Sequence, residues 1–295
     1  MRVQGVYPPI ATPFDVQGRL DTAALQANIE KWNETGLNGY VVAGSNGESV
    51  LLEQDEVAEA VRVVRGAALA EQLVIAGTGC QSTAATIRLT RAAADAGADV
   101  ALIMTPSFYS GEMSAAALRK HYEVVADASP IPVLIYNVSK FTHLVIAPAI
   151  VAQLAAHPNI IGIKDSDGNI AQVIDLLRLC PADFGVLIGN APAFLSGLQV
   201  GAVGGILALA NVAPRECVAI WNLARAGKLD EAREIHFRMI PVGRAVTTGY
   251  GVPGLKAALD ALGFHGGAPR PPLQPLDAAA RSAVRQILQE AGLLA

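Results

Sequence analysis

Short apolar segments alternate with longer amphipathic segments from the N-terminus to about residue 226. Each apolar segment is too short for a typical helix and is bounded by glycine, proline or polar residues, which is typical of buried parallel strands. We expect one strand in each of these segments: Gly5–Thr12, Gly39–Ala43, Leu73–Gly77, Val100–Thr105, Pro132–Tyr136, Ile160–Lys164, Gly185–Gly189 and Val203–Leu207.

The segments between these strands carry apolar residues at helical spacing. In one of them, Val57, Val61 and Val64 fall on one face, whereas charged residues such as Glu59 and Arg62 fall on the others. Eight strand segments, each followed by a helical one, favour a closed (β/α)8 TIM barrel over an open doubly wound sheet. The predicted fold class is therefore α/β.

The strand segments stop after residue 226. Helical patterns then cover Leu229–Met239, Gly254–Leu262 and Ala278–Ala291, and the Gly-Gly-Ala-Pro-Arg-Pro-Pro segment at 266–272 has the composition of a turn. We therefore expect two regions, a barrel at residues 1–226 and a C-terminal helical appendage at residues 227–295 that packs on the barrel.

The composition excludes several classes of protein. The 295 residues are 52% hydrophobic and 16% charged with a net charge of −4, which excludes a disordered chain and offers no basic surface for nucleic acid or an anionic membrane. Residues 184–214 carry no charge, but prolines and six glycines interrupt them, which favours strands around a helix over a membrane span. The three cysteines lack disulfide or zinc spacing, and the opening residues lack the apolar core of a signal peptide. We expect a cytoplasmic protein without nucleic-acid or membrane partners.

Lys164 is the most informative residue for the chemistry, because active sites of such barrels lie at the C-terminal ends of the strands. It directly ends the apolar run 159–163. Burial lowers the pKa of an amine, and a free amine can attack a ketone to form a Schiff base. A lysine that extends its ammonium group to solvent, or pairs with Asp165, would give the same pattern.

Two further strand ends carry reactive groups. Tyr136 closes its strand, where its phenol could relay protons, although a tyrosine that only packs and hydrogen-bonds would look the same. The segment Gly44–Glu48 has two glycines that leave backbone N–H groups free to converge on an anion, and Ser45 adds a hydroxyl donor. An ordinary turn would use the same residue types.

Neither a metal nor an organic cofactor is expected. The five histidines form no metal-spaced pair. The glycine-rich segment Gly201–Gly205 precedes a strand instead of following one, which is not the dinucleotide-binding arrangement.

Three motifs resemble those of the pyruvate-dependent class I aldolase family that includes dihydrodipicolinate synthase and N-acetylneuraminate lyase. Gly44–Glu48 is similar to the family's Gly-Thr-Thr-Gly-Glu carboxylate loop, Tyr136–Val138 to its Tyr-Asn-Val/Ile motif, and Ile161–Asp165 to its Schiff-base strand. The resemblance extends over nearly the whole chain, including the Gly-Gly-Ile sequence at 204–206 and Asn211.

Within the family, the chain most resembles the 4-hydroxy-2-oxoglutarate aldolase branch. The Ser45-Asn46 version of the loop points to this branch, as does Ser166 after the Lys-Asp pair. Three longer segments support the same assignment: Gly77–Thr83, Ser129–Val133 and Gly251–Lys256.

Four positions depart from the family pattern. Dihydrodipicolinate synthases carry an arginine five residues after the catalytic tyrosine, where it holds the aldehyde's carboxylate, but this chain has Phe141 there. Ser139 replaces the usual proline, and His143 replaces a glycine. The tyrosine that the family donates across a subunit interface is replaced by Phe108, with Tyr109 one residue later. Tyr109 could substitute for it, or Ser45 could exchange protons with water.

The resemblance implies a cofactor-free lyase that cleaves a 4-hydroxy-2-oxoacid to pyruvate or glyoxylate and a carbonyl product. It implies that Lys164 forms the Schiff base, that Tyr136 relays the proton, and that Ser45 and Asn46 bind the oxoacid carboxylate. Beside the substrate, we expect Ser166, Gly189, Ile206, Phe108, Tyr109 and Phe141. The implied partners are a small 2-oxoacid and further copies of the chain in a homotetramer.

Three alternatives stay open. Phe141 argues against a 4-hydroxy-tetrahydrodipicolinate synthase, and an aldolase or dehydratase of 2-keto-3-deoxy sugar acids would use the same lysine. The alternative from a different class is a non-catalytic oxoacid-binding barrel, which the presence of both Lys164 and Tyr136 disfavours.

Overall fold

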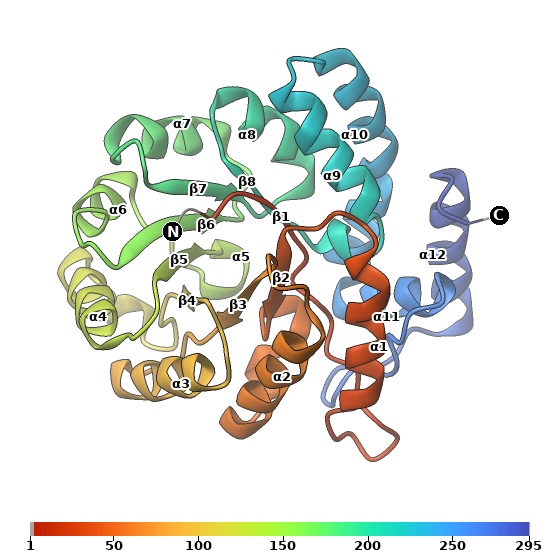
Figure 1. Cartoon of the computed structure of the whole chain (residues 1–295), viewed down its shortest axis with the longest axis horizontal. Coiled ribbons are helices and arrows are strands. Elements are labelled where there is room, and N and C mark those ends of the chain that lie inside the picture. Colours follow the sequence, from red (N-terminus) through yellow and green to blue (C-terminus); the bar gives the residue numbers. More distant parts are fainter. Residues whose placement is uncertain (1–2, 295) are drawn as a thin grey trace.

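Eight parallel strands form the centre of the part of the chain that the computed structural model describes, residues 3–294. They are β1 (Gly5–Tyr7), β2 (Gly39–Val42), β3 (Leu73–Gly77), β4 (Val100–Met104), β5 (Val133–Asn137), β6 (Ile160–Asp165), β7 (Gly185–Ile188) and β8 (Gly204–Ile206). The sheet runs β1-β8-β7-β6-β5-β4-β3-β2. Hydrogen bonds from Asn38 to Val6 and from Ile10 to Val41 join β1 to β2, so the sheet closes. The predicted TIM barrel is confirmed (Figure 1).

Helices surround this barrel on the outside (Figure 1). They are α1 (Thr22–Asn33), α2 (Gln54–Ala67), α3 (Thr83–Asp95), α4 (Ala115–Ala128), α5 (Ser139–Thr142), α6 (Pro148–Leu154), α7 (Ile170–Leu179), α8 (Phe194–Val200) and α9 (Pro214–Arg225). In α2 the residues Val57, Val61 and Val64 are buried, whereas Glu59 and Arg62 on the same helix are exposed. The amphipathic pattern of this segment therefore faces the core as predicted.

Strand β1 is shorter than the predicted segment Gly5–Thr12 and ends at Tyr7. Pro8 and Pro9 follow it directly, and a proline has no backbone N–H to donate to a neighbouring strand. Only the isolated bridge between Pro9 and Val41 continues the pairing.

The C-terminal region continues with α10 (Leu229–Arg244), α11 (Gly251–Ala261) and α12 (Ala278–Glu290), and a π-helical turn η6 (Ala245–Gly249) separates the first two. Helix α10 runs past the predicted end at Met239. Pro241 lies inside it without ending it, because the Ala245 amide still donates to the Pro241 and Val242 carbonyls. Helix α12 packs against α11 and α10, and α11 and α12 lie at one side of the barrel (Figure 1).

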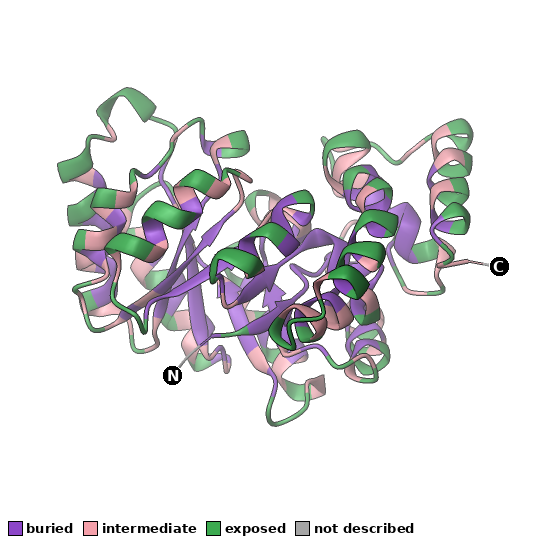
Figure 2. Cartoon of the chain, turned by 90° about the horizontal axis from the view of Figure 1, so that it is seen from above, coloured by how far each residue is buried: buried purple, intermediate pink, exposed green. Residues whose placement is uncertain are grey.

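The core has two layers. Side chains inside the barrel, such as Val41, Leu102 and Leu187, form one buried cluster, and the much larger cluster lies between the strands and the surrounding helices. Figure 2 shows the strands buried and the outer faces of the helices exposed. The inner cluster fills the barrel as a packed core, which leaves the strand ends as the place for a site.

No helix within residues 3–294 has the length and apolar content needed to cross a membrane. Residues 1, 2 and 295, which end the two regions expected from the sequence, lie outside the described residues.

Candidate active site

Lys164 and Tyr136 are paired neighbours on adjacent strands. The register of β5 and β6 places them opposite each other at the C-terminal ends of the strands. The Lys164 ammonium nitrogen lies 4.0 Å from the centre of the Tyr136 ring, and both residues are buried, at 2% and 5% exposure. The two groups expected to carry the chemistry therefore face one another inside the barrel mouth.

Asp165 is not the partner of Lys164. Successive side chains on a strand point to opposite faces, and Asp165 accepts hydrogen bonds on its other side from Asn137 (2.8 Å) and Gln172 (2.7 Å). Burial raises the pKa of this carboxyl group, and those two hydrogen bonds oppose the rise. The lysine amine is thus left without a carboxylate neighbour on the same strand.

Ser139 accounts for one departure from the family pattern. Its amide and hydroxyl both donate to Oδ1 of Asp167, at 3.0 and 2.7 Å, and Asn137 donates to Oδ2 of the same carboxylate at 2.8 Å. A proline at position 139 would have neither donor. His143, the residue in place of a glycine, has a left-handed backbone with φ of 56° at the end of α5.

The loop after β2 brings Ser45 to the same pair. Residues Ser45–Gly47 form a short 3-10 turn, η1, and the Ser45 hydroxyl lies 3.3 Å from the Tyr136 hydroxyl. The first hydrogen bond inside the turn runs from the Gly47 amide to the Gly44 carbonyl. The Ser45 and Asn46 amides precede it and so have no acceptor within the turn. Their positions fit the predicted role as donors to an anion.

The electrostatics of Tyr136 favour proton exchange. Burial by itself raises the pKa of this phenol, because an ionised phenol would lose its hydration. The Lys164 ammonium group and the neighbouring hydroxyls of Ser45 and Ser166 act in the opposite direction and outweigh burial. The pKa of Tyr136 consequently lies below its ordinary value of 10.0.

Ser166 and Gly189 form the next part of the wall. The buried Ser166 hydroxyl lies near the Tyr136 hydroxyl but makes no hydrogen bond of good geometry among the described residues. A Cβ at position 189 would lie 2.0 Å from that hydroxyl, so any residue larger than glycine would displace the Ser166 side chain. The Gly189 amide donates to the Asp165 carbonyl at 2.6 Å, which fixes this close approach. A buried unpaired hydroxyl at a strand end is well placed to bind a substrate oxygen.

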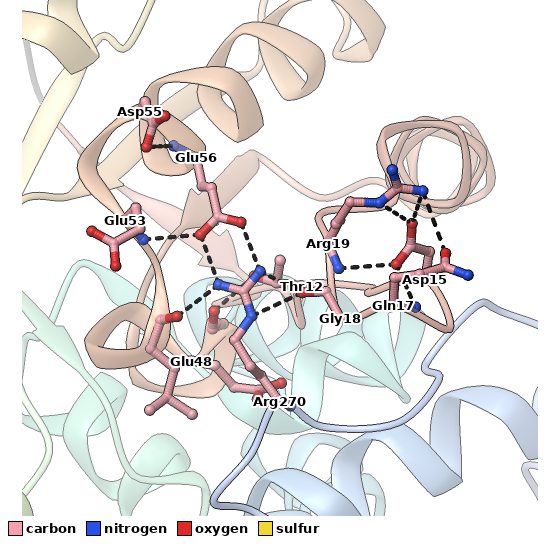
Figure 3. Close-up of polar contacts among 12 residues, drawn as sticks. Thr12, Asp15, Gln17, Gly18, Arg19, Glu48, Glu53, Asp55, Glu56 and Arg270 are labelled. Carbon is pink, nitrogen blue, oxygen red and sulfur yellow. Dashed lines mark hydrogen bonds and ion pairs between the residues drawn. The ribbon is translucent and has the colours of Figure 1, made fainter.

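Glu48 connects the loop after β2 to the C-terminal region. It follows η1 with a left-handed backbone (φ 59°), and its side chain is buried. Its Oε2 accepts from the Arg270 amide at 2.8 Å. The Arg270 guanidinium group also binds Glu56 through two hydrogen bonds and donates to the Gly18 carbonyl (Figure 3). These hydrogen bonds hold the segment around Arg270 against the loop after β2 and against α2.

Lys256, on α11, is a second buried lysine and completes this support. Its ammonium group lies 2.7 Å from Oε1 of Glu48, 4.4 Å from the centre of the Phe14 ring and 2.9 Å from the Ala268 carbonyl. Burial lowers its pKa, and the Glu48 carboxylate acts against that shift. Since the charge of Lys256 is matched by Glu48, Lys256 supports the loop, and Lys164 stays the lysine expected to form the Schiff base.

One cavity of about 820 Å³ joins the predicted residues. Its lining includes most of the residues expected at the site: Ser45, Asn46, Tyr136, Phe141, Lys164, Ser166, Gly189 and Ile206. Phe108 and Tyr109 are not part of the lining. Their rings pack against each other 5.1 Å apart and are 78% and 70% exposed in the single chain.

The cavity also has a wall that sequence reasoning missed. Arg244, Thr247 and Thr248 reach it from α10 and η6, and Lys140 reaches it from α5. Lys140 directly precedes Phe141 after a strand end, which was a usable signal. The residues of α10 and η6 had no such signal in the sequence, because the sequence pattern does not predict which face of the barrel the C-terminal helices cover. Within residues 3–294 there is no cluster of three or more His, Cys, Asp or Glu that could hold a metal ion.

Comparison with known proteins gives a consistent result. A model of the dihydrodipicolinate synthetase family matches residues 2–291. The chain is 37% identical over 286 residues to a 4-hydroxy-tetrahydrodipicolinate synthase of Methanothrix thermoacetophila, covering 97% of this chain and 96% of the relative. It is 38% identical over 296 residues to the synthase of Methanoculleus marisnigri, covering 98% and 99%.

A solved structure gives the same picture. The dihydrodipicolinate synthase of Acinetobacter baumannii, determined in complex with pyruvate, superposes with a TM-score of 0.94 at 30% identity, covering 99% of this chain and all of the other. These relatives carry the name of the synthase and not that of 4-hydroxy-2-oxoglutarate aldolase. The comparisons therefore favour the alternative over the aldolase branch that the sequence motifs favoured.

Proposed function

The chain belongs to the dihydrodipicolinate synthetase family, and from that premise we propose that it makes or breaks a carbon–carbon bond beside an imine on Lys164. The observation that carries this proposal is the buried Lys164 amine facing the Tyr136 ring at 4.0 Å, within a cavity that also holds Ser45. The class of enzyme is a Schiff-base carbon–carbon lyase, and the substrate is a small 2-oxoacid such as pyruvate or glyoxylate.

The chemistry follows from the residues at the strand ends. The Lys164 amine adds to the 2-oxo carbon, and loss of water leaves a protonated imine. In the cleavage direction, the proton of the 4-hydroxyl group is removed and the bond between C3 and C4 breaks. Its electron pair moves to the imine nitrogen and leaves an enamine, which takes a proton at C3 and is hydrolysed to the free oxoacid. Condensation runs through the same steps in reverse.

Each remaining residue of the site has a role in this scheme. Tyr136 moves the protons, helped by the Ser45 hydroxyl 3.3 Å away. The Ser45 and Asn46 amides hold the oxoacid carboxylate. Gly189 and Ile206 shape the space around the imine, and the unpaired Ser166 hydroxyl faces the second substrate's oxygens.

Two substrate assignments remain, and different observations favour them. The names of the relatives favour 4-hydroxy-tetrahydrodipicolinate synthase activity. Phe141 favours the aldolase that cleaves 4-hydroxy-2-oxoglutarate, because it removes the cation with which such synthases hold the aldehyde's carboxylate. We place the synthase first, since the relatives cover the whole chain, and test it against the aldolase directly. The two are distinguished by assaying condensation of pyruvate with the synthase's aldehyde beside pyruvate and glyoxylate release from 4-hydroxy-2-oxoglutarate.

Assembly into a homotetramer is part of the same proposal. It is supported by the exposed Phe108 and Tyr109 rings, which lie after β4 where the family resemblance implies an intersubunit contact. Size-exclusion chromatography with light scattering measures the mass directly.

Reductive trapping tests the central step. Treating the protein with pyruvate and borohydride should fix the imine as a secondary amine on Lys164, because reduction removes the C=N bond that water would hydrolyse. Peptide mapping should find the adduct there and not on Lys140, which lines the same cavity but is exposed. An adduct on Lys140, or on no lysine, would contradict the mechanism.

A further inference from the structure

The cavity carries more positive than negative charge. Four charged residues line it: Glu48, Lys140, Lys164 and Arg244. The one carboxylate among them, Glu48, is neutralised by Lys256 at 2.7 Å. Lys164 forms the imine in the proposed reaction. The other two cations, Lys140 and Arg244, have no carboxylate beside them in the cavity lining. Such a cavity attracts a substrate that carries a second negative charge.

Of these two cations, Arg244 makes fewer interactions with the rest of the protein. It is the last residue of α10 and is exposed, and its side chain has no hydrogen bond, ion pair or ring contact among the described residues. By contrast, Arg233 on the same helix is paired with Asp230. A basic residue suits the C-terminal end of a helix in general, but that preference does not require the side chain to line a cavity.

The part of the cavity wall around Arg244 contacts the segment after β5. Arg244 runs directly into η6, whose Thr247 and Thr248 also line the cavity. The Lys140 ammonium group donates to the Thr247 carbonyl at 3.3 Å and lies 5.3 Å from the centre of the Phe141 ring. The C-terminal region and the segment after β5 thus meet at the cavity, with a cation on each side.

We propose that Arg244 binds a carboxylate at the far end of the second substrate, and so selects dicarboxylic substrates for the imine chemistry proposed above. The phenyl ring of Phe141 cannot bind an anion, whereas a guanidinium group binds a carboxylate through two parallel hydrogen bonds. Arg244 supplies this group from a different element of the fold, the end of α10. The role is one of specificity, because Arg244 takes no part in forming the imine.

A pair of oxoacids tests the role without knowledge of the natural substrate. 2-Oxoglutarate and 2-oxopentanoate have the same chain length and can both form an imine with Lys164. Their C4 and C5 then take the place of the atoms that a second substrate contributes on condensation, but only 2-oxoglutarate ends in a carboxylate. Borohydride trapping over a range of concentrations gives the half-saturating concentration of each acid. We expect the wild-type protein to be half-saturated at a lower concentration of 2-oxoglutarate than of 2-oxopentanoate.

Arg244→Met should remove this preference. The half-saturating concentration of 2-oxoglutarate should rise about 10- to 100-fold, which corresponds to the loss of a hydrogen-bonded charge. The values for pyruvate and 2-oxopentanoate should stay within about twofold, and Arg244→Lys should restore part of the preference. Arg233→Met, on the same helix but outside the cavity, is the matched control and should behave as the wild type.

Three results would overturn the assignment of Arg244. One is a wild-type protein that does not distinguish the two five-carbon acids. Another is an Arg244→Met variant that keeps the distinction. The third is an equal loss for all three acids with an unchanged melting temperature, which would make Arg244 a general support of the site. Absence of any pyruvate adduct in the wild type would instead contradict the imine mechanism itself.

Discussion

Tyr136 is the residue whose contribution is most directly measurable. Its hydroxyl faces Ser45 at 3.3 Å, and its ring lies under the Lys164 ammonium group. We expect Tyr136→Phe to lower kcat about 10²- to 10⁴-fold, the usual contribution of a positioned acid–base group. KM should change far less, because we propose that the Ser45 and Asn46 amides, and not Tyr136, hold the oxoacid carboxylate. Steady-state kinetics with single-turnover measurements separate the two effects.

Tyr109→Phe is the matched control for that substitution. Tyr109 is 70% exposed and lies outside the cavity of the single chain, so its loss should leave kcat nearly unchanged. A comparable loss in both variants would mean that Tyr109 enters the site from a neighbouring copy. A Tyr136→Phe variant with near wild-type kcat, and chemistry as the slow step, would remove Tyr136 from the mechanism.

The site residues at strand ends could be predicted from the sequence. The residues that reach the site through the packing of the C-terminal helices could not. Lys164, Tyr136 and Ser45 each follow an apolar run, and the closed barrel forces such positions to converge. Arg244 and Lys256 lie in helices of the C-terminal region, where the pattern predicts a helix but not its neighbours.

At the scale of elements, the loop η1 depends on α11 through one buried ion pair. Lys256 and Glu48 are 1% and 0% exposed at the side chain. We expect Lys256→Met to lower the free energy of unfolding by about 3–5 kcal/mol, because it leaves a buried carboxylate without its partner. Glu48→Gln should also destabilise the protein. The double variant should lose less than the two single variants together, because neither charge is then left alone.

Urea unfolding of the four proteins in this cycle measures the coupling between the two residues. Lys228→Met is the matched control, because Lys228 pairs with Glu231 at the surface, where both are 58% exposed. That exposed pair should contribute less than about 1 kcal/mol. Purely additive losses at Glu48 and Lys256 would show that the pair does not couple η1 to α11. The half-saturating pyruvate concentration in trapping should rise in both single variants.

The elements themselves followed from the sequence with local errors. Strand β1 ended early at two prolines, and α10 continued through Pro241 because its last carbonyls kept hydrogen-bonded partners. The segment around Arg270 has the composition of a turn, as predicted. Nothing in that composition indicates that it crosses the loop after β2 and binds Glu48 and Glu56.

At the scale of the whole molecule, His121 makes stability depend on pH. It is 6% exposed on α4, its Nδ1 lies 2.9 Å from the Thr83 hydroxyl, and its Nε2 has no partner among the described residues. Burial lowers its pKa from 6.5 to about 4. The unfolded chain therefore binds a proton at a higher pH than the folded one, so stability falls as the pH is lowered from about 6.5 to about 4.

The expected loss from this histidine is about 3 kcal/mol across that range. Unfolding free energies measured at several pH values, for the wild type and for His121→Gln, give the contribution as a difference. The wild type should lose more stability than the variant on acidification. Parallel curves for the two proteins would show that His121 takes up its proton equally well in the folded state.

The contact between Arg270 and Glu48 can form only late in the synthesis of the chain. Arg270 and Glu48 are 222 positions apart in the chain. A ribosome adds about 5–20 residues per second from the N-terminal end, so roughly ten to forty seconds separate the two residues. From the addition of residue 164 until residue 270 follows, a nascent chain has the lysine of the proposed Schiff base but lacks the segment that binds Glu48. The last barrel strand ends at residue 206, whereas the segment that binds Glu48 is added 64 residues later.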